Sequence, residues 1–375
     1  MGRIIIVGGY GAFGARAAER LAREPGLDVI IAGRSLASAR AQAGMLSPTA
    51  EASVTAAALD ATRVTAQELR ALAPGVVINA SGPFQAQDYH LARTCIAAGC
   101  HYVDLADARG FVTGITQLDA EARAANVSVV SGASSVPGLS SAAVRHMAGN
   151  LAQLDEVHIG ISPGNSFDPG IATAASIISA AGKPIQARSG GRWTTLYAWH
   201  GLHRHVFPEI GARWMSDVDV PDLELLPQHY PELRTARFSA GLEVSVFHLG
   251  LWAAAGLVRA GLLRDLGALA PPMLAAKRRL SMLGTDAGGM FVRVVGRDQQ
   301  GTSRASTWTL IARRGDGPYV PAMASVILAK RLVTGEGPPP GATPCFGLFP
   351  LADFEAEVAD LDITCTLERE AQIAA

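Results

Sequence analysis

A glycine-rich turn between a strand and a helix stands at the start of the chain and constrains the fold more than any other feature. Residues 3–7 form a short apolar, β-branched run that is typical of a buried parallel strand. Gly9, Gly11 and Gly14 follow with the spacing G-x-G-x-x-G, and residues 15–23 have a helical pattern. Gly9 is expected to permit the tight turn, Gly11 to let the backbone approach a pyrophosphate, and Gly14 to let the helix pack on the strand. The pattern therefore predicts a Rossmann domain that binds a dinucleotide. The residues expected to hold its phosphates are Gly9, Tyr10, Gly11, Ala12, Phe13 and Gly14.

The end of the second expected strand, residues 27–32, indicates which dinucleotide binds. NAD sites usually place an acidic residue there to bind the ribose hydroxyls, but no acidic residue occurs between Val29 and Ala50. Arg34 instead offers a permanently charged guanidinium to a 2′-phosphate, and Ser35 offers a second donor. The alternative is that Arg34 is simply an exposed side chain. We expect NADP(H) as the cofactor.

Alternating strands and helices continue through residues 1–138, which we assign to one NADP-binding Rossmann domain with a doubly wound parallel sheet. The remaining strands are expected at 56–60, 75–80, 101–105 and 127–130, and a helix at 91–98. Ligands of such a sheet bind beyond the carboxyl ends of its strands. At those ends we expect Asp60 to contact the adenine. The residues expected near the nicotinamide ribose and phosphate are Ala80, Ser81, Gly82 and Pro83.

These segments together resemble the NADP-binding domain of the saccharopine dehydrogenase-like oxidoreductases. The resemblance rests on the segments 7–14, 32–34, 77–84, 102–105 and 135–138, in that order and spacing. It implies an NAD(P)-linked oxidoreductase with a second domain that shapes the substrate site. Members of known activity often form or cleave a secondary amine by reducing an imine, and others have been associated with lipids or enoyl reduction.

Longer amphipathic strands begin after residue 138 and predict a second, α+β domain over residues 139–334 with a mainly antiparallel sheet. Its strands are expected at 157–161, 192–199, 234–246, 290–295 and 307–312, and its helices at 172–181, 249–263 and 318–332. A sheet covered by helices on one face often forms a dimer surface, so we expect a homodimer. The C-terminal segment 335–375 is expected to pack back on the N-terminal domain.

Two residues are candidates for catalysis. Asp104, at the end of an expected strand, could orient the nicotinamide amide, bind a substrate amine or exchange a proton; a purely structural hydrogen-bonding role is equally open. His200 stands in the histidine-rich segment 199–205 and could bind a substrate carboxylate or supply a proton. A strand end or surface loop is the plainer interpretation of that segment. No metal site is expected, because the spacing fits no metal motif and no acidic residue lies nearby.

An almost wholly apolar stretch covers residues 249–263 and is interrupted only by Arg259. It is too short and too charged to span a bilayer. Three interpretations remain open, namely a buried helix, a subunit contact and an interfacial helix that touches lipid.

Charge and cysteine content exclude several classes of protein. The formal net charge is −1 and no long basic tract occurs, which argues against a nucleic-acid partner. The four cysteines lack Cys-x-x-Cys spacing and the N-terminus lacks a signal-peptide pattern, so we expect a cytoplasmic protein. The leading hypothesis is an NADPH-dependent reductase that acts on an imine or a related unsaturated small molecule. The alternatives are a lipid-linked enoyl-type reductase and a non-catalytic NADP-binding interaction module.

Overall fold

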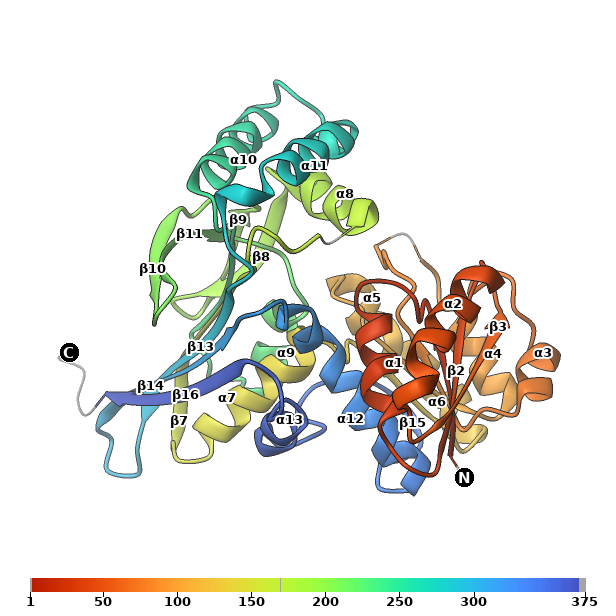
Figure 1. Cartoon of the computed structure of the whole chain (residues 1–375). Helices are drawn as coiled ribbons and strands as arrows, with labels where there is room; N and C mark the ends of the chain where they lie inside the picture. The colour runs from red at the N-terminus through yellow and green to blue at the C-terminus, as the bar shows by residue number, and fades with distance from the viewer. Residues whose placement is uncertain (1, 86, 169, 371–375) are drawn as a thin grey trace. The chain divides into compact units, whose positions relative to one another are not determined.

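The computed structural model describes residues 2–85, 87–168 and 170–370. Contacts divide them into two compact units, each built on its own large sheet (Figure 1). The first unit holds the residues up to Leu139 together with Pro318–Glu357. The second holds Ser140–Gly317 and the described residues from Val358 onward.

Seven parallel strands form the sheet of the first unit, in the order β15-β6-β5-β4-β1-β2-β3. They are β1 (Gly2–Val7), β2 (Leu27–Gly33), β3 (Ser53–Ala58), β4 (Val76–Asn79), β5 (His101–Asp104), β6 (Ser128–Ser131) and β15 (Gly341–Pro344). The central strands are continuous apolar runs, as in β1, where Ile4, Ile5 and Ile6 are fully buried. Such runs are typical of a parallel sheet covered on both faces. The order β3-β2-β1-β4-β5-β6 is that of a doubly wound dinucleotide-binding fold, so the Rossmann prediction is confirmed.

Helices connect these strands and pack on the sheet. They are α1 (Gly14–Ala22), α2 (Leu36–Leu46), α3 (Ala66–Leu72), α4 (His90–Ala98), α5 (Arg109–Gly114), α6 (Asp119–Ala124), α12 (Val320–Thr334) and α13 (Leu351–Glu357). The apolar faces of α3, α4 and α6 close one core with the sheet, and this core includes Leu69, Leu91, Ile96 and Leu118. The third strand lies three residues earlier than expected at its start, because Leu59 is buried just beyond the strand and extends the apolar pattern.

The last third of the chain is shared between the units, unlike the expected division at residues 139–334 and 335–375. Helix α12 packs on α1, β1, β4 and β5 of the first unit, although the sequence analysis placed it in the second domain. Strand β15 lies within the expected C-terminal segment and extends the first sheet beside β6. Strand β16 (Ile363–Glu370) instead pairs with β14 in the second unit. The sequence of an apolar helix does not indicate on which sheet the helix packs. Domain bounds assigned by sequence order alone therefore miss that α12 and β15 belong to the first unit.

The sheet of the second unit has seven strands in the order β10-β11-β12-β7-β13-β14-β16. Its pairs are antiparallel except for β12 with β7, which confirms the predicted α+β architecture. The strands other than β16 are β7 (Gln153–Ser162), β10 (His203–Phe207), β11 (Gly211–Asp217), β12 (Thr235–Gly241), β13 (Gly288–Arg297) and β14 (Ser303–Ala312). A separate hairpin is formed by β8 (Pro184–Ser189) and β9 (Arg192–Tyr197).

Five helices belong to the second unit: α7 (Ser140–Ala148), α8 (Gly170–Ala180), α9 (Asp222–His229), α10 (Ser245–Arg259) and α11 (Ala270–Arg279). Helices α7, α9 and α10 pack against the sheet. The expected strand 234–246 ends at Gly241 and its last residues begin α10, which starts four residues before the expected helix 249–263. Within the described residues, no helix combines the length and the apolarity needed to cross a bilayer.

Candidate cofactor and active site

The turn between β1 and α1 leaves little or no room for a Cβ atom at its glycine positions. The amide of Gly8 donates to the Ala32 carbonyl at 2.8 Å, and the amide of Gly11 donates to the Gly8 carbonyl at 2.9 Å. A Cβ on Gly14 would lie 2.2 Å from the Gly8 oxygen, and a Cβ on Gly11 would lie 3.2 Å from it. The left-handed residue of the turn is Gly8, with φ of +81°, whereas the sequence analysis gave the tight turn to Gly9.

The start of α1 is suited to an anion. The helix has nine residues, no acidic residue in its first turn and no side-chain cap hydrogen bond at Phe13. The first amide groups of a helix point out of its N-terminus, where the helix dipole favours negative charge. Ala12 is exposed beside this end. A dinucleotide pyrophosphate therefore fits the turn that Gly9, Tyr10, Gly11, Ala12, Phe13 and Gly14 form.

Tyr10 connects the glycine turn to the end of β2. Its hydroxyl accepts a hydrogen bond from the Ser35 amide at 3.1 Å. Its ring fills the space above Gly33, where a Cβ would lie 2.5 Å from a ring carbon. The Ser35 hydroxyl caps α2 by accepting from the Ser38 amide at 3.2 Å. Arg34 is exposed at this corner, beside the N-terminus of α2, as a 2′-phosphate site requires.

Asp60 lies close enough to Arg34 to be affected by its charge. The carboxylate accepts hydrogen bonds from the Thr62 amide at 3.0 Å and the Thr62 hydroxyl at 2.8 Å. These bonds, with smaller contributions from Arg63 and Arg34, lower the pKa of Asp60. The expected adenine contact of Asp60 stays a prediction.

The end of β4 lies against the glycine turn. A Cβ on Gly8 would lie 2.8 Å from the Ala80 carbonyl oxygen, and the Ala80 amide donates to the Val7 carbonyl at 2.8 Å. The structure thus brings Ala80 and Ser81 next to Gly8 and Gly14, although the two segments are far apart in sequence. Gly82 and Pro83 are exposed, as a loop that contacts a ligand would be.

A buried hydrogen-bond network, which the sequence analysis did not identify, supports this loop. The Asn79 side chain accepts from the Ser81 amide at 3.1 Å and from the Ser81 hydroxyl, and it donates to the Tyr102 hydroxyl at 3.1 Å. Asn79 stands beside both Val7 and Asp104 at the carboxyl ends of neighbouring strands. The sequence signal for Asn79 was its amide side chain at the end of an apolar strand.

Asp104 is fully buried at the end of β5. Its Oδ1 accepts from the Gly132 amide at 2.8 Å, the Ser131 hydroxyl at 2.9 Å and the Ala106 amide at 3.0 Å. Within the described residues no donor reaches Oδ2 at hydrogen-bonding geometry, although the nearby Tyr102 hydroxyl helps to lower the carboxyl pKa. Burial outweighs these donors and raises the pKa of Asp104 to about 6. The carboxylate therefore holds the ends of β5 and β6 together.

Comparison with known proteins identifies the domain that carries these residues. Residues 4–130 match the family described as the saccharopine dehydrogenase NADP binding domain. The first unit therefore contains an NADP-binding domain of the saccharopine dehydrogenase type, and the chain is an NADP-dependent oxidoreductase. The cofactor is NADP(H), as the residues at the end of β2 predicted. No curated protein matches the chain in sequence.

One solved structure shares the fold of this oxidoreductase, and others align with it less well. An apo saccharopine dehydrogenase (L-Glu forming) from Saccharomyces cerevisiae aligns with a TM-score of 0.68 and 16% identity over 99% of this chain and 100% of the yeast chain. A mutant meso-dapdh with DAP from Clostridium tetani aligns with a TM-score of 0.45 and 12% identity over 96% of this chain and 98% of the other. At these identities the yeast structure establishes the shared fold alone.

His200, the second catalytic candidate, lies in the second unit in the turn between β9 and β10. Its backbone carbonyl accepts from the Asp217 amide at 2.7 Å, and its ring lies edge-on to those of Tyr197 and Trp252. Burial, and next the charge of Arg259, lower the pKa of His200. The ring is thus neutral near pH 7. The catalytic roles of Asp104 and His200 stay predictions.

A cluster of three other imidazoles lies on the sheet of the second unit. His158 of β7 lies 5.4 Å from His203 of β10, measured between ring centroids, and it packs edge-on against Phe291. His205 stacks on the Phe291 ring at 3.8 Å. In the described part of the chain, no group of His, Cys, Asp and Glu side chains could hold a metal ion. The strand pattern Val157-His158-Ile159 was the signal for His158, a polar residue alternating with core residues.

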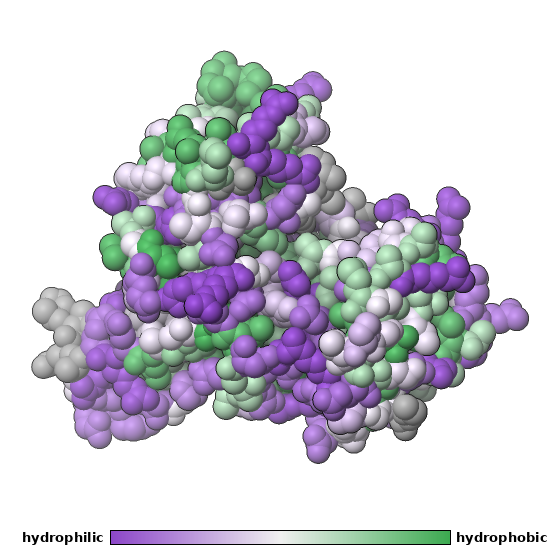
Figure 2. Space-filling view, in the orientation of Figure 1, coloured by the Kyte–Doolittle hydropathy of each residue, from purple (hydrophilic) through white to green (hydrophobic). Residues whose placement is uncertain are grey.

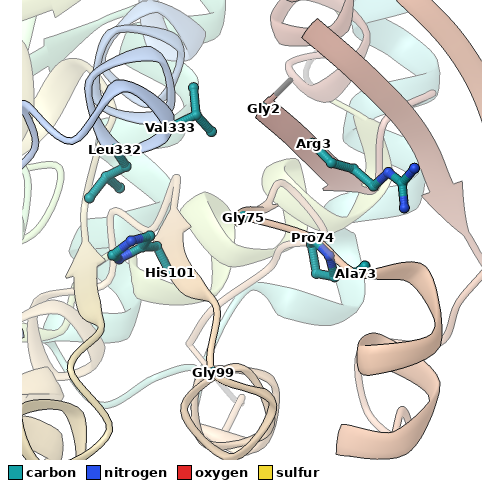
Figure 3. Close-up of a pocket in the computed structure, with 9 residues that line it drawn as sticks. All are labelled: Gly2, Arg3, Ala73, Pro74, Gly75, Gly99, His101, Leu332 and Val333. Atoms are coloured by element: carbon teal, nitrogen blue, oxygen red, sulfur yellow. The ribbon is translucent and has the colours of Figure 1, made fainter.

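The cavity drawn in Figure 3 lies at the other end of the first sheet. It has a volume of about 410 Å³ and is lined by residues such as Arg3, Gly75, His101 and Val333. These positions border the amino ends of β1, β4 and β5, whereas ligands of doubly wound sheets bind at the carboxyl ends. Arg3 is also engaged, because it donates to Asp28 at 2.6 Å and to the Leu72 carbonyl at 2.7 Å. We assign no cofactor role to this cavity.

Proposed function

We propose that this oxidoreductase works in the reductive direction, with NADPH, on an imine or a related unsaturated small molecule. In such a reduction the carbon of the C=N bond accepts a hydride from NADPH, the nitrogen accepts a proton, and a secondary amine and NADP⁺ are released. The observation that carries the proposal is the glycine turn with Arg34 at the adjacent strand end. The name of the yeast structure, a saccharopine dehydrogenase, supports substrates with a carbon–nitrogen bond.

The residues of the first unit have distinct roles in this proposal. The turn at residues 8–14 would hold the pyrophosphate, Arg34 and the N-terminus of α2 would hold the 2′-phosphate, and the loop from Ala80 to Pro83 would border the nicotinamide half. Asp104 is buried and occupied with backbone and hydroxyl donors. It therefore acts best as a positioning residue for the loops after β5 and β6. His200 is the candidate in the second unit for proton supply or for binding a substrate carboxylate.

Calorimetric titration with NADPH and with NADH tests the cofactor part. Replacing Arg34 by Ala removes a charge-assisted contact of about 1.5–3 kcal/mol, so NADPH affinity should fall about ten- to hundredfold. NADH affinity should change little. Arg40→Ala is the matched control, because Arg40 is an exposed arginine on α2. Equal losses for both cofactors would show that Arg34 does not contact the 2′-phosphate.

A spectrophotometric screen of NADPH oxidation tests the substrate part. Cyclic imines and mixtures of amino acids with 2-oxo acids form one arm, and enoyl thioesters form the other. Turnover in the first arm supports the imine proposal. A lipid-linked enoyl-type reductase is the second candidate, and the exposed apolar side chains between residues 246 and 283 favour it. Turnover with enoyl thioesters alone would replace the imine proposal.

We also propose a homodimer in a reducing compartment. The sheet of the second unit carries the partly exposed row Arg237, His158 and Arg293 across three neighbouring strands, on a face suited to a second copy. The four cysteines all lie within the described residues, and none of them forms a disulfide. Sedimentation at the monomer mass over a wide concentration range would refute the dimer.

A further inference from the structure

Exposed apolar side chains gather on one segment of the second unit. Among the described residues, ten of the fourteen large apolar side chains that are exposed lie within residues 246–283, which we call the apolar tip. The tip comprises α10, the loop that follows it, α11 and the turn Ser281–Leu283. Met282 is 84% exposed, Leu262 71% and Leu283 57%. Figure 2 shows hydrophobic surface over this end of the unit, where Figure 1 labels α10 and α11.

Helix α10 is apolar on two opposite sides, and the unit covers only one of them. His248, Leu251 and Ala255 are buried and face the unit. Leu249 and Leu257, away from this face, and Trp252, at its edge, are exposed. A helix that is hydrophobic all round is normally buried in a core or a membrane. The second apolar side therefore requires a hydrophobic partner that the unit itself does not supply.

The charges of the tip indicate an anionic partner. Residues 245–283 contain five basic side chains and one acidic side chain, in a chain whose net charge is −1. Lys277 donates to the carbonyls of Asn165 and Phe167, and Arg278 pairs with Asp168 at 2.7 Å. Arg264 and Arg279 are exposed beside the apolar side chains. Basic residues around an exposed apolar helix, with a tryptophan at its edge, are typical of segments that lie in a membrane interface.

We propose that the apolar tip docks this enzyme on the surface of a bilayer that contains anionic lipids. The 15 residues of α10 fall short of the about 20 that a spanning helix needs, so the helix lies along the interface. Leu262, Leu263 and Met282 enter the boundary between headgroups and acyl chains, and Arg264 and Arg279 contact lipid phosphates. The docking is independent of the substrate and of the direction of the reaction.

Vesicle cosedimentation of the full chain tests the charge requirement. Phosphatidylcholine vesicles are compared with vesicles that also contain phosphatidylglycerol, at low and high ionic strength. The wild type should bind the anionic vesicles more tightly, and salt should weaken that binding. Each cation near an anionic surface contributes roughly fivefold in partitioning, so Arg264→Gln with Arg279→Gln should lower binding about 25-fold. No binding of the wild type to either vesicle overturns the proposal.

Exposed apolar variants test the hydrophobic requirement without disturbing the core. Leu262→Ser with Met282→Ser should lower binding to anionic vesicles at least about tenfold, because two large side chains no longer enter the bilayer. Met45→Ser with Val206→Ser is the matched control, since Met45 and Val206 are similarly exposed but lie outside the tip. Control variants that lose the same affinity would refute a role for the tip.

Two further measurements distinguish docking on lipid from self-association through the tip. Brominated lipids should quench the fluorescence of Trp252, and the quenching should disappear in Trp252→Phe. A different pair of results would show that the tip is an interface between two copies and that the lipid proposal is wrong. In that case the wild type does not bind vesicles, and Leu262→Ser with Met282→Ser converts a dimer into a monomer in sedimentation. NADPH titration of each variant reports the cofactor site separately, so failure of docking and failure of the proposed reaction are distinguishable.

Discussion

Acidification is expected to destabilise the second unit through histidines that fold in the neutral form. Burial lowers the pKa of His248 to about 4, with a smaller contribution from His203. The His248 side chain is fully buried, its Nε2 lies 3.0 Å from the Ser216 hydroxyl, and its Nδ1 accepts from the Leu242 amide. Burial also lowers the pKa of His158 to about 3 and that of His205 to about 4.

The sign follows from proton linkage. The ordinary pKa of these imidazoles is 6.5, so the unfolded chain takes up protons as the pH falls through 6.5, while the folded unit takes them up only near 4. Stability is therefore fully present above about pH 6.5 and is lost as the pH falls toward 4. At pH 5, His248 alone accounts for a loss of about 2 kcal/mol relative to pH 7.5. His158 and His205 are partly exposed and add less. Asp217, whose pKa burial raises, acts in the opposite direction.

Urea unfolding followed by tryptophan fluorescence measures this effect selectively, because all five tryptophans lie in the second unit. The free energy of unfolding is compared at pH 7.5 and pH 5 for the wild type and for His248→Asn, which keeps an acceptor for the Leu242 amide. The variant should lose about 2 kcal/mol less than the wild type between the two pH values. His146→Asn is the control, because His146 is an exposed histidine of the same unit. An identical pH dependence for His248→Asn and the wild type would refute the argument.

Three other perturbations test the remaining structural claims. Gly14→Ala places a Cβ 2.2 Å from the backbone oxygen of Gly8, so NADPH affinity measured by calorimetry should fall more than about tenfold. Gly44→Ala is the control and should bind NADPH normally, because a Cβ on Gly44 meets no atom within 4 Å. Asp104→Asn should remove a pH dependence of the first unit. The folded carboxyl holds its proton up to about pH 6, so the stability of the wild-type unit falls by at most about 3 kcal/mol as the pH rises from 3.8 to 6. Hydrogen exchange in peptides around residues 101–106 and 128–133 should show the difference between variant and wild type. Glu243→Gln leaves the buried Arg213 guanidinium without its carboxylate and should cost the second unit about 3 kcal/mol or more in urea unfolding, whereas Glu156→Gln, at an exposed glutamate, should cost little.

The Rossmann fold and the cofactor could be predicted because the signals that indicate them are local in the sequence. The positions of Gly11 and Gly14 restrict the backbone within one turn, and Arg34 follows β2 directly. The left-handed conformation at Gly8 was not predicted, although its cause is equally local. Gly9 has the spacing of the motif with Gly11 and Gly14, whereas the adjacent Gly8 takes the left-handed conformation against the Ala80 carbonyl.

The network around Asp104 could not be predicted, because it depends on strand register. The strands β4, β5 and β6 were each expected close to their observed bounds. The bonds from Asn79 to Tyr102, and from Ser131 to Asp104, form only because β4, β5 and β6 pair with their carboxyl ends aligned. The expected strand 234–246 failed for a related reason, since its apolar residues fit a strand and the first turn of α10 equally well.

The substrate is less accessible to this reasoning than the cofactor for a physical reason. A phosphate is held by backbone amides and one cation, so glycine spacing and one arginine are sufficient to predict its site. A substrate is distinguished by side chains that its pocket brings together from distant strands, and a fold shared at 16% identity does not conserve such a set. The histidines of the second unit illustrate this point. His158, His203 and His205 come from two strands that are not neighbours in the sheet, and burial in that packing lowers the pKa of His158 and of His205. Assigning the substrate therefore requires turnover measurements on variants of the second unit, with the cofactor site left intact.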